Sequence, residues 1–490
     1  MHHPDLSTAD GPATVKFPHR SRRGVLLGLS VAQLTVVTLT GLLLLAVLMQ
    51  SGVTGALKLI PLWVVILAAV FIRHRGRSLA DWAPIALRYA LRRFRGQLIW
   101  LARPSGRPRR EGLLHLPGTA ASLRVVTSPD GQFGAVHDPH NGTLTAVVKV
   151  SSRAFALLDP ATQNSNVSGW GRTLAGLART GHIARVQVLE RTVPDSGDAL
   201  NRYWNEHGNA DTHLAGPIYA DLLAAAGPAA APHEAYVALA LDLKAARRLI
   251  NQAGGGLSGA FTVLAQTASS FDQAARNSGL TPTGWLPANE IAAVIRTAYD
   301  PKASAALDQW SSTGRPQADP AAAGPVVLIE KADQIQTDSA HHATFWIENW
   351  PRVETSPGFL HQLLFTSGVR RALSLSYDPK ALDAALKDVQ RKKATVIADA
   401  AERQRKGQVD SEEDSVEYAD IKQRERQLIS GHADVGLTGL LTVSADTTEQ
   451  LNAACAAIET AAADSFIDLR PLTWQQAEAF TNAALPLARP

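Results

Sequence analysis

Cysteine is almost absent from this chain of 490 residues, because Cys455 is the only one. A single cysteine excludes an intramolecular disulfide and leaves no cysteine cluster that could hold zinc. The residue lies in the alanine-rich stretch NAACAAIET. We therefore expect Cys455 to be a small buried side chain on a helix.

The motifs of common nucleotide-binding and hydrolytic sites are also missing. The glycine cluster at residues 254–259 lacks the lysine that a phosphate loop requires, so we expect it to begin a helix. The sequence contains no G-x-S-x-G elbow, no H-E-x-x-H pair and no dinucleotide fingerprint.

The remaining candidates for a catalytic or metal site are weak. His341 and His342 precede a predicted strand, where adjacent side chains point to opposite faces, so they do not suit one metal ion. Three isolated acids have no recognisable acid–base partner: Glu330, Glu348 and Asp378. We predict that the protein is not an enzyme and has no catalytic residue, no cofactor and no metal.

Positive charge is concentrated in one segment. The formal net charge is +4, but residues 73–110 hold eleven arginines and a single acid, Asp81. The rest of the chain is mildly acidic. The basic balance is therefore no argument for nucleic-acid binding by the whole protein.

Charge is absent from a long run near the start of the chain. Gly24 to Gln50 has no ionisable side chain and exceeds the roughly 20 apolar residues that a membrane-spanning helix needs. A second run, Leu57 to Ile72, is shorter, and it can cross the membrane only if the Lys58 side chain extends to the far interface. We predict a transmembrane helical hairpin over residues 24–72, with Ser51 to Ala56 as its connection.

Cationic residues flank both outer sides of this hairpin, and such flanks stay in the cytoplasm. We therefore expect a multi-pass protein of the plasma membrane with both termini cytoplasmic and residues 1–23 as an N-terminal tail. A cleaved signal peptide is the first alternative, but its apolar centre would be shorter. A buried helical pair of a soluble core is the second, and it would not stay uncharged over this length.

Residues 73–111 predict a basic amphipathic helix and a linker next to the membrane. Apolar side chains recur at three- and four-residue spacing, between Trp82 and Trp100: Leu87, Ala90, Leu91, Phe94, Leu98 and Leu101. Such a helix lies along an anionic leaflet with its cations at the headgroups. The predicted membrane-surface contacts are Arg73, Arg75, Arg77, Arg88, Arg92, Arg93 and Arg95. The alternative is an arm that docks a partner ATPase or DNA.

The rest of the chain predicts an α+β fold in two cytoplasmic subdomains, 112–311 and 326–490, separated by a loop rich in proline and alanine. The first begins with a small antiparallel meander, in which Asn141-Gly142 indicates a type I′ turn. The second contains a charged helical hairpin at 379–429, with Asp378 as the predicted N-cap.

A strand followed by a helix recurs around residues 235, 371 and 437, and Tyr-Asp-Pro-Lys-Ala occurs at 299 and at 377. Because the pentapeptide follows a helix once and a strand once, we interpret it as recurring cap chemistry. It does not establish a duplication.

Longer stretches resemble known families. The hairpin, GRSLADWAPIALRYALRRFRGQLIW and GLLHLPGTAASLRVVTSPDGQFGAVHDPHNGTLTAVVKV resemble the PrgI-like membrane proteins of actinobacterial conjugative elements. The later segments ATFWIENWPR, RRALSLSYDPKALDAALKDV, GLTGLLTVSADTTEQL and LRPLTWQQAEAFTNAALPL are similar in order to the N-terminal, non-ATPase domain of the VirB-type conjugation ATPase. No ATPase residue is carried over, because no position matches one.

The resemblance implies a non-catalytic inner-membrane scaffold of a conjugative or type IV-like secretion apparatus. Its partners would be membrane lipids, a separate secretion ATPase and other membrane subunits, with self-association left open. An EccE-like membrane component of type VII secretion is the alternative. Two further alternatives are a membrane-bound enzyme with an unrecognised site and a DNA contact through residues 73–110, which would weaken steeply with salt.

Overall fold

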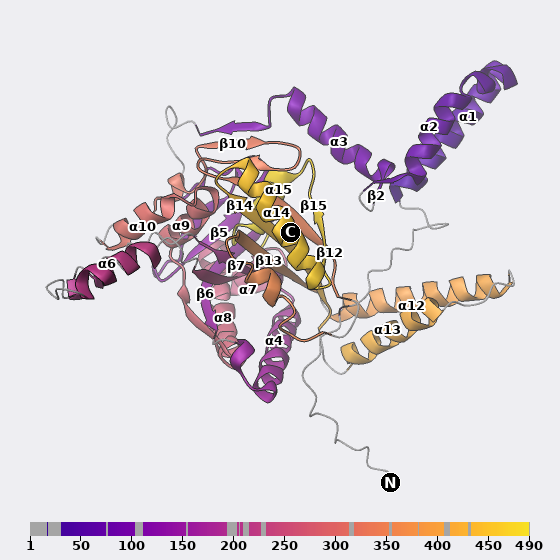
Figure 1. Cartoon of the computed structure of the whole chain (residues 1–490). Helices are drawn as coiled ribbons and strands as arrows, with labels where there is room; N and C mark the ends of the chain where they lie inside the picture. The colour runs from indigo at the N-terminus through magenta and orange to yellow at the C-terminus, as the bar shows by residue number, and fades with distance from the viewer. Residues whose placement is uncertain are drawn as a thin grey trace, which may run out of the picture.

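The computed structural model describes residues 17, 31–74, 77–102, 111–152, 155–193, 203–204, 206–208, 215–226, 232–312, 318–351, 355–380, 382–405, 412–429 and 433–489. Within them it has a large antiparallel sheet with helices on both faces, and an N-terminal pair of helices that stands away from this body (Figure 1). The mixed α and β fold class is therefore confirmed.

The N-terminal part reaches the sheet through short elements. In chain order these are α1 (Val31–Lys58), α2 (Ile60–Phe71), β1 (Arg73–His74), β2 (Arg77–Ser78), α3 (Leu79–Phe94) and β3 (Ile99–Leu101). β1 and β2 form a separate two-stranded hairpin, and β3 pairs with β10 at one edge of the main sheet. The segment that follows the helix pair is thus built into the folded body.

The first half of the body contains a βαββαβ unit. Its elements are β6 (Thr143–Ser152), α4 (Pro160–Thr180), β7 (Ile183–Thr192), β8 (His233–Asp242), α8 (Gly256–Arg276) and β9 (Leu280–Trp285). The strands lie side by side in the order β9-β6-β8-β7, and every neighbouring pair is antiparallel. This is the ferredoxin-like arrangement.

The second half repeats the same unit. Its elements are β12 (His341–Asn349), α11 (His361–Leu364), β13 (Arg370–Pro379), β14 (Val435–Ala445), α14 (Thr448–Asp464) and β15 (Asp468–Pro471). The order β15-β12-β14-β13 matches that of the first half, again with antiparallel neighbours. We refer to the two units as the first repeat and the second repeat.

The two repeats form one sheet because β7 pairs with β13. Each is preceded by a short hairpin that joins its first strand: β4 (Arg124–Thr127) with β5 (Gly134–Asp138), and β10 (Val327–Glu330) with β11 (Ile335–Gln336). Each is followed by a helix, α9 (Ala288–Tyr299) or α15 (Gln476–Ala483). The main sheet thus has thirteen strands.

The chain therefore carries an internal duplication, which the sequence interpretation did not recognise. The strand-and-helix pairs near residues 235 and 437 occupy equivalent places, as β8 with α8 and β14 with α14. The two Tyr-Asp-Pro-Lys-Ala segments do not, since one begins at the end of α9 and the other lies in β13. Equivalent strands share their pairing rather than a common sequence.

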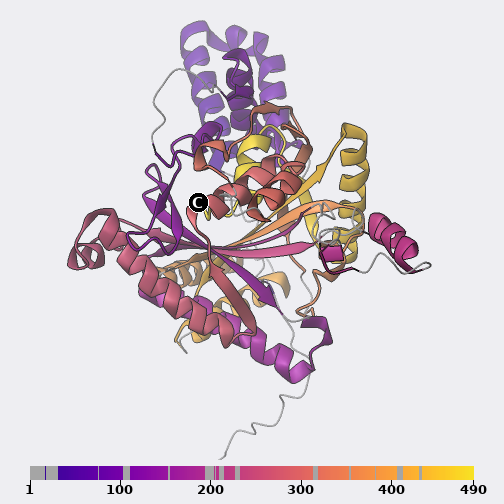
Figure 2. The same ribbon diagram turned by 90° about the vertical axis from the view of Figure 1, so that its left-hand side faces the viewer.

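Helices cover both faces of the sheet, which Figure 2 shows close to edge-on. On one face α9 and α15 bury an apolar core with Ile291, Tyr299 and Phe480. On the other face α4 and α8 cover the first repeat, and α11 and α14 cover the second. The elements outside this scheme are α7 (Arg247–Gln252), α10 (Ala303–Ser312), and the 3-10 turns Gly118–Ala120, Phe155–Leu157 and Pro320–Ala322.

Both repeats carry an insertion between their second and third strands. The first repeat inserts α6 (Ala215–Ala226). The second inserts α12 (Leu382–Arg405) and α13 (Glu412–Ile429), the predicted charged helical hairpin, which projects from the body (Figure 1). Its inner side is held by a small apolar cluster: Ala385, Val389, Val396, Ile421 and Leu428.

Local sequence explains several element boundaries and corrects two predictions. Asp378 is not the N-cap of α12, because β13 extends to Pro379 and the Asp378 carboxylate accepts a hydrogen bond of 2.9 Å from Arg185. The Asn141-Gly142 turn is not type I′, because only Gly142 has a positive φ, of 67°. The side chain of Asp138 accepts the amides of His140 and Asn141 and supports a longer turn.

Candidate membrane-proximal site

The α1–α2 pair is an antiparallel hairpin that reverses at Gly52. This glycine interrupts α1 with φ 64° and ψ −168°. The side-chain amide of Gln33 donates a hydrogen bond of 2.7 Å to the carbonyl of Val70, so these two residues lie at the same level. Gly52 is midway between them in sequence, as a reversal at that residue requires. The predicted connection Ser51–Ala56 is therefore largely helical.

This geometry gives two legs of equal length. Residues 33–51 and residues 53–71 each have 19 residues, or about 28 Å at 1.5 Å per residue. Large apolar side chains are exposed on both legs: Leu39, Leu42, Leu45, Met49, Leu62, Val64, Val65 and Phe71. Among the described residues, one helix, Gln33–Lys58, is long and apolar enough by length and composition to cross a membrane, and its range includes the reversal at Gly52.

The helix α3 is docked on the second repeat by one of its faces. Ser78 caps its first turn by accepting the amide of Asp81 at 3.2 Å. Trp82 is buried edge-to-face against Trp474, with ring centroids 5.5 Å apart, and Tyr89 lies 6.4 Å from the same ring. Burial, followed by the Glu330 charge, raises the pKa of Tyr89 above its ordinary value.

Trp474 has a positive φ of 64°, which is uncommon for a bulky residue. Its amide donates to the carbonyl of Ala332, which fixes the ring beneath α3. Backbone strain of this kind persists only where the surrounding structure enforces it. The position thus has a distinct structural role as the platform that receives α3.

A buried ion pair completes the docking of α3. Arg92 donates to Glu330 at 2.6 Å, and the Glu330 side chain is fully buried while that of Arg92 is 25% exposed. The other carboxylate oxygen of Glu330 accepts the amide of Ala477 at the start of α15, at 3.2 Å. One carboxylate therefore links α3 to α15. Glu330 was not isolated, as the sequence suggested, because its partner is 238 residues away.

The opposite face of α3 is apolar and exposed. Leu87, Leu91 and Phe94 follow the spacing i, i+4, i+7 and are 62%, 47% and 92% exposed. Figure 1 places α3 between the base of the α1–α2 pair and the body. The exposed fractions of these three side chains show that the body does not cover this face. The predicted apolar stripe is thus present on α3, but Leu98 beyond the helix is buried.

The predicted membrane-contact residues do not share one environment. Arg88 is 65% exposed and lies 3.6 Å from Glu478, and Arg93 and Arg95 are exposed. Arg92 is instead the partner of Glu330. Arg73 and Arg77 lie in β1 and β2, and their side chains fall outside the described structure, as does Arg75 entirely. Trp82 and Trp100, near the two ends of the predicted helix, pack into the body.

The other residues singled out in the sequence have structural environments. His342 is fully buried between Thr337 at 2.8 Å and Ser444 at 2.7 Å, and burial lowers its pKa to about 3. Cys455 is partly buried, and burial raises the pKa of its thiol to about 12. The glycine cluster begins α8, as predicted. Within the described residues, no group of three or more His, Cys, Asp or Glu is arranged to hold a metal ion.

No protein-family model matches the chain, and no curated protein matches it in sequence.

Proposed function

We propose that this protein is a non-catalytic scaffold of the inner membrane that serves a conjugative or type IV-like secretion apparatus and docks a separate ATPase. The α1–α2 pair would be its membrane anchor, and the two repeats would lie in the cytoplasm. The observation that carries the anchor is a pair of contacts made by the segments on either side of that hairpin.

Both flanking segments bind the second repeat. Before α1, Phe17 stacks on Trp350 with centroids 5.0 Å apart and lies 5.4 Å from Phe359. After α2, α3 docks on Trp474, which directly follows β15 of that repeat, and on Glu330 in the β10–β11 hairpin that precedes it. Two segments that touch one folded unit lie on one side of a bilayer, so the chain between them crosses an even number of times. A single crossing by α1 would separate Phe17 from Trp350.

The lengths of the legs support two crossings. About 28 Å for each leg approaches the roughly 30 Å of a hydrocarbon core, and the exposed side chains of both legs are apolar. Lys58 lies six residues beyond the reversal at Gly52, from where its long side chain can reach the far headgroups. Because the chain reverses at Gly52, residues Val53 to Lys58 lie at the start of the second leg, although the range of α1 includes them.

The orientation of α3 extends the anchor into the headgroup region. Its exposed face, with Leu87, Leu91 and Phe94, would rest on the acyl boundary, and Arg88, Arg93 and Arg95 would contact anionic headgroups. We do not assign this role to Arg92, because its guanidinium is bound to Glu330.

The scaffold part of the proposal rests on the resemblance to conjugation proteins. The segments similar to the non-ATPase domain of the VirB-type ATPase run from β12 to α15, so they coincide with the second repeat. That repeat is also the one that holds the membrane anchor. A unit of this kind would place a secretion ATPase at a fixed position beneath the membrane.

Topology is tested by cysteine labelling of the full chain in intact cells and in inverted vesicles, with Cys455→Ala as background. We expect Ser51→Cys to react with an impermeant maleimide only from outside and Gly171→Cys only from the cytoplasmic side. Labelling of both positions from one side would overturn the hairpin.

The partner is tested by purifying the tagged full chain from membranes of its own cell in mild detergent. We expect a secretion-type ATPase among the copurifying proteins, enriched over a tagged unrelated membrane protein. If no ATPase is enriched while the hairpin topology holds, the scaffold role is wrong and the anchor remains.

A further inference from the structure

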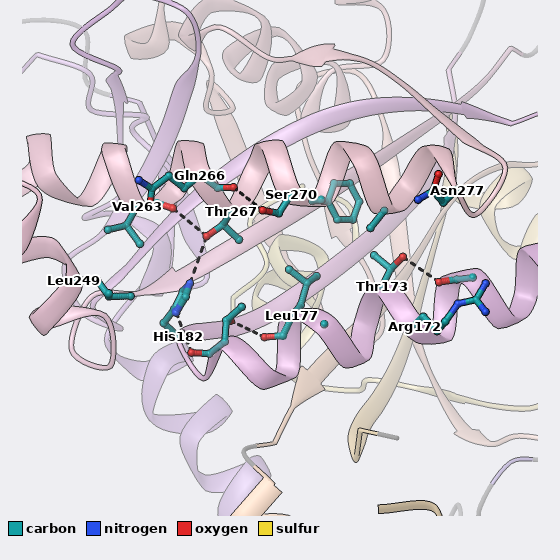
Figure 3. Close-up of a pocket in the computed structure, with 15 residues that line it drawn as sticks. Arg172, Thr173, Leu177, His182, Leu249, Val263, Gln266, Thr267, Ser270 and Asn277 are labelled. Atoms are coloured by element: carbon teal, nitrogen blue, oxygen red, sulfur yellow. Dashed lines mark hydrogen bonds between the residues drawn. The ribbon is translucent and has the colours of Figure 1, made fainter. Parts of the chain in front are cut away.

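An open groove lies between α4 and α8 on the outer surface of the first repeat, with a volume of about 740 Å³ (Figure 3). Its floor is apolar and includes Leu177, Val263 and Phe271. Its rim carries Arg172 and several uncharged polar side chains, and none of the described residues that line it is a carboxylate. Figure 1 shows α4 and α8 on the side of the body far from the α1–α2 pair.

The groove exists because the two helices diverge. At one end α4 approaches α8 so closely that a Cβ on Gly169 would lie 3.0 Å from the Ser278 hydroxyl. Farther along, a Cβ on Gly176 would meet no atom within 4 Å. In the second repeat the corresponding space is filled by leucines of the α11 segment that pack with alanines of α14: Leu360, Leu363, Leu364, Ala454 and Ala461. The fold itself therefore does not require an open groove here.

The insertion of the same repeat presents an exposed apolar helix. In α6, Ile218 and Leu222 are 63% and 60% exposed, four residues apart on one face. Tyr219 is 45% exposed and packs against Trp204, with ring centroids 4.6 Å apart and planes tilted by 42°. Asp221 is the one charged residue of this twelve-residue helix. A helix that exposes this much apolar surface is typical of an interaction element.

We infer that α6 of one copy docks in the α4–α8 groove of a second copy of this chain. The lengths agree, since α6 has 12 residues and the wall of the groove from Gly169 to Thr180 has 12, about 18 Å in each case. An apolar helix face laid in an apolar groove is a recurring mode of recognition. Asp221 complements Arg172, the one charged lining residue that is cationic at all ordinary pH values.

A second copy fits better than the same chain. α6 is inserted beyond Thr192 and before His233, whereas the open end of the groove is at His182. These positions are at opposite ends of the ten-residue strand β7, about 33 Å apart. The contact joins two different surfaces, so it builds a ring or a row of copies. Anchoring in one membrane raises the effective concentration of the copies, so a small interface is sufficient for their association.

This inference does not depend on the secretion role, and crosslinking between chains tests it. Two full-length chains with different tags and the Cys455→Ala background are co-expressed, one with Gly176→Cys and the other with Leu222→Cys. We expect oxidation in the membrane to give the mixed-tag dimer at least tenfold faster than the matched pair of Gly171→Cys with Leu222→Cys. Gly171 is on the same helix, has open space around it and does not line the groove.

Equal rates for the two pairs would overturn the inference. It would also be overturned if one chain carrying both Gly176→Cys and Leu222→Cys formed only an internal crosslink, because α6 would then occupy its own groove.

Filling the groove gives an independent test. Gly176→Trp places a ring in the groove, and Gly171→Trp places one on the open surface, with neither Cβ meeting another atom. We expect Gly176→Trp to reduce the fraction of oligomer in mild detergent at least fivefold and Gly171→Trp to leave it unchanged. Arg172→Glu and Asp221→Arg should each reduce it, and the combination should restore it. Oligomers unaffected by Gly176→Trp would refute the docking.

Discussion

The ion pair between Arg92 and Glu330 determines how firmly α3 is held on the body. Replacing Arg92 by Ala leaves a carboxylate that is fully buried and has lost the cation that it binds. Breaking a buried pair in this way costs roughly 3–5 kcal/mol. Because the Arg92 side chain is 25% exposed, we expect the lower end, about 3 kcal/mol.

Hydrogen exchange of the full chain in nanodiscs measures this cost locally. A loss of about 3 kcal/mol corresponds to roughly a hundredfold faster exchange, since each 1.4 kcal/mol is tenfold. We expect this change in the amides of α3 and β3, with no change in α4 and α8. Glu330→Gln together with Arg92→Ala should cost less than Arg92→Ala alone, because no charge is left buried.

Arg88→Ala is the matched control on the same helix. Its pair with Glu478 is 3.6 Å long and both side chains are largely exposed, so the cost should stay below about 1 kcal/mol. If Arg88→Ala and Arg92→Ala had equal effects, or if exchange rose equally in both repeats, the docking described for α3 would be wrong.

Three further predictions concern the body. Arg489 pairs with Asp138 at 3.0 Å, both side chains being almost fully buried, so Arg489→Ala should lower the free energy of unfolding by about 3–5 kcal/mol in urea titrations. Burial raises the pKa of the Asp138 carboxyl, but the amide of Asn141 and the Arg489 guanidinium outweigh this effect and hold that pKa below its ordinary value. The stabilisation by the Asp138–Arg489 ion pair is therefore complete above pH 4 and is lost on further acidification. His342 is neutral when folded, with a pKa lowered by burial to about 3, and it takes up a proton near pH 6.5 when unfolded. The contribution of His342 to the free energy of unfolding is therefore complete above pH 6.5 and is about 2 kcal/mol smaller at pH 5. His342→Gln should remove this part of the pH dependence of the urea midpoint. On α4, Gly176→Ala should stabilise the protein by about 1 kcal/mol in thermal unfolding, whereas Gly169→Ala should destabilise it because the new Cβ would lie 3.0 Å from Ser278.

Local patterns predicted the elements whose signals are strong over a short stretch. The apolar runs gave the α1–α2 pair, the three- and four-residue spacing gave the exposed face of α3, and charge patterning gave the projecting pair α12 and α13. The reversal at Gly52 lies within the predicted connection Ser51–Ala56, but the rest of that stretch is helical, because one residue with a positive φ suffices to turn the chain.

The composition of the candidate site could not be predicted in the same way. Arg92 looked like one more headgroup ligand among seven arginines, because the helix pattern gives spacing on one element and says nothing about which element covers it. Its partner Glu330 and the platform Trp474 come from strands and turns more than 200 residues away. No local signal marks either residue as part of a site.

By itself, the sequence determined the apolar N-terminal helices, their basic flank and the alternation of strands and helices, because hydrophobic periodicity and charge act over a few neighbouring residues. Only the tertiary structure decided that two ferredoxin-like repeats share one sheet, that Phe17 and α3 meet on the second repeat, and that the groove of the first repeat is open. These features depend on the register between β7 and β13 and on the spacing between packed helices. Both are set by contacts between residues far apart in the chain, which no window of sequence contains.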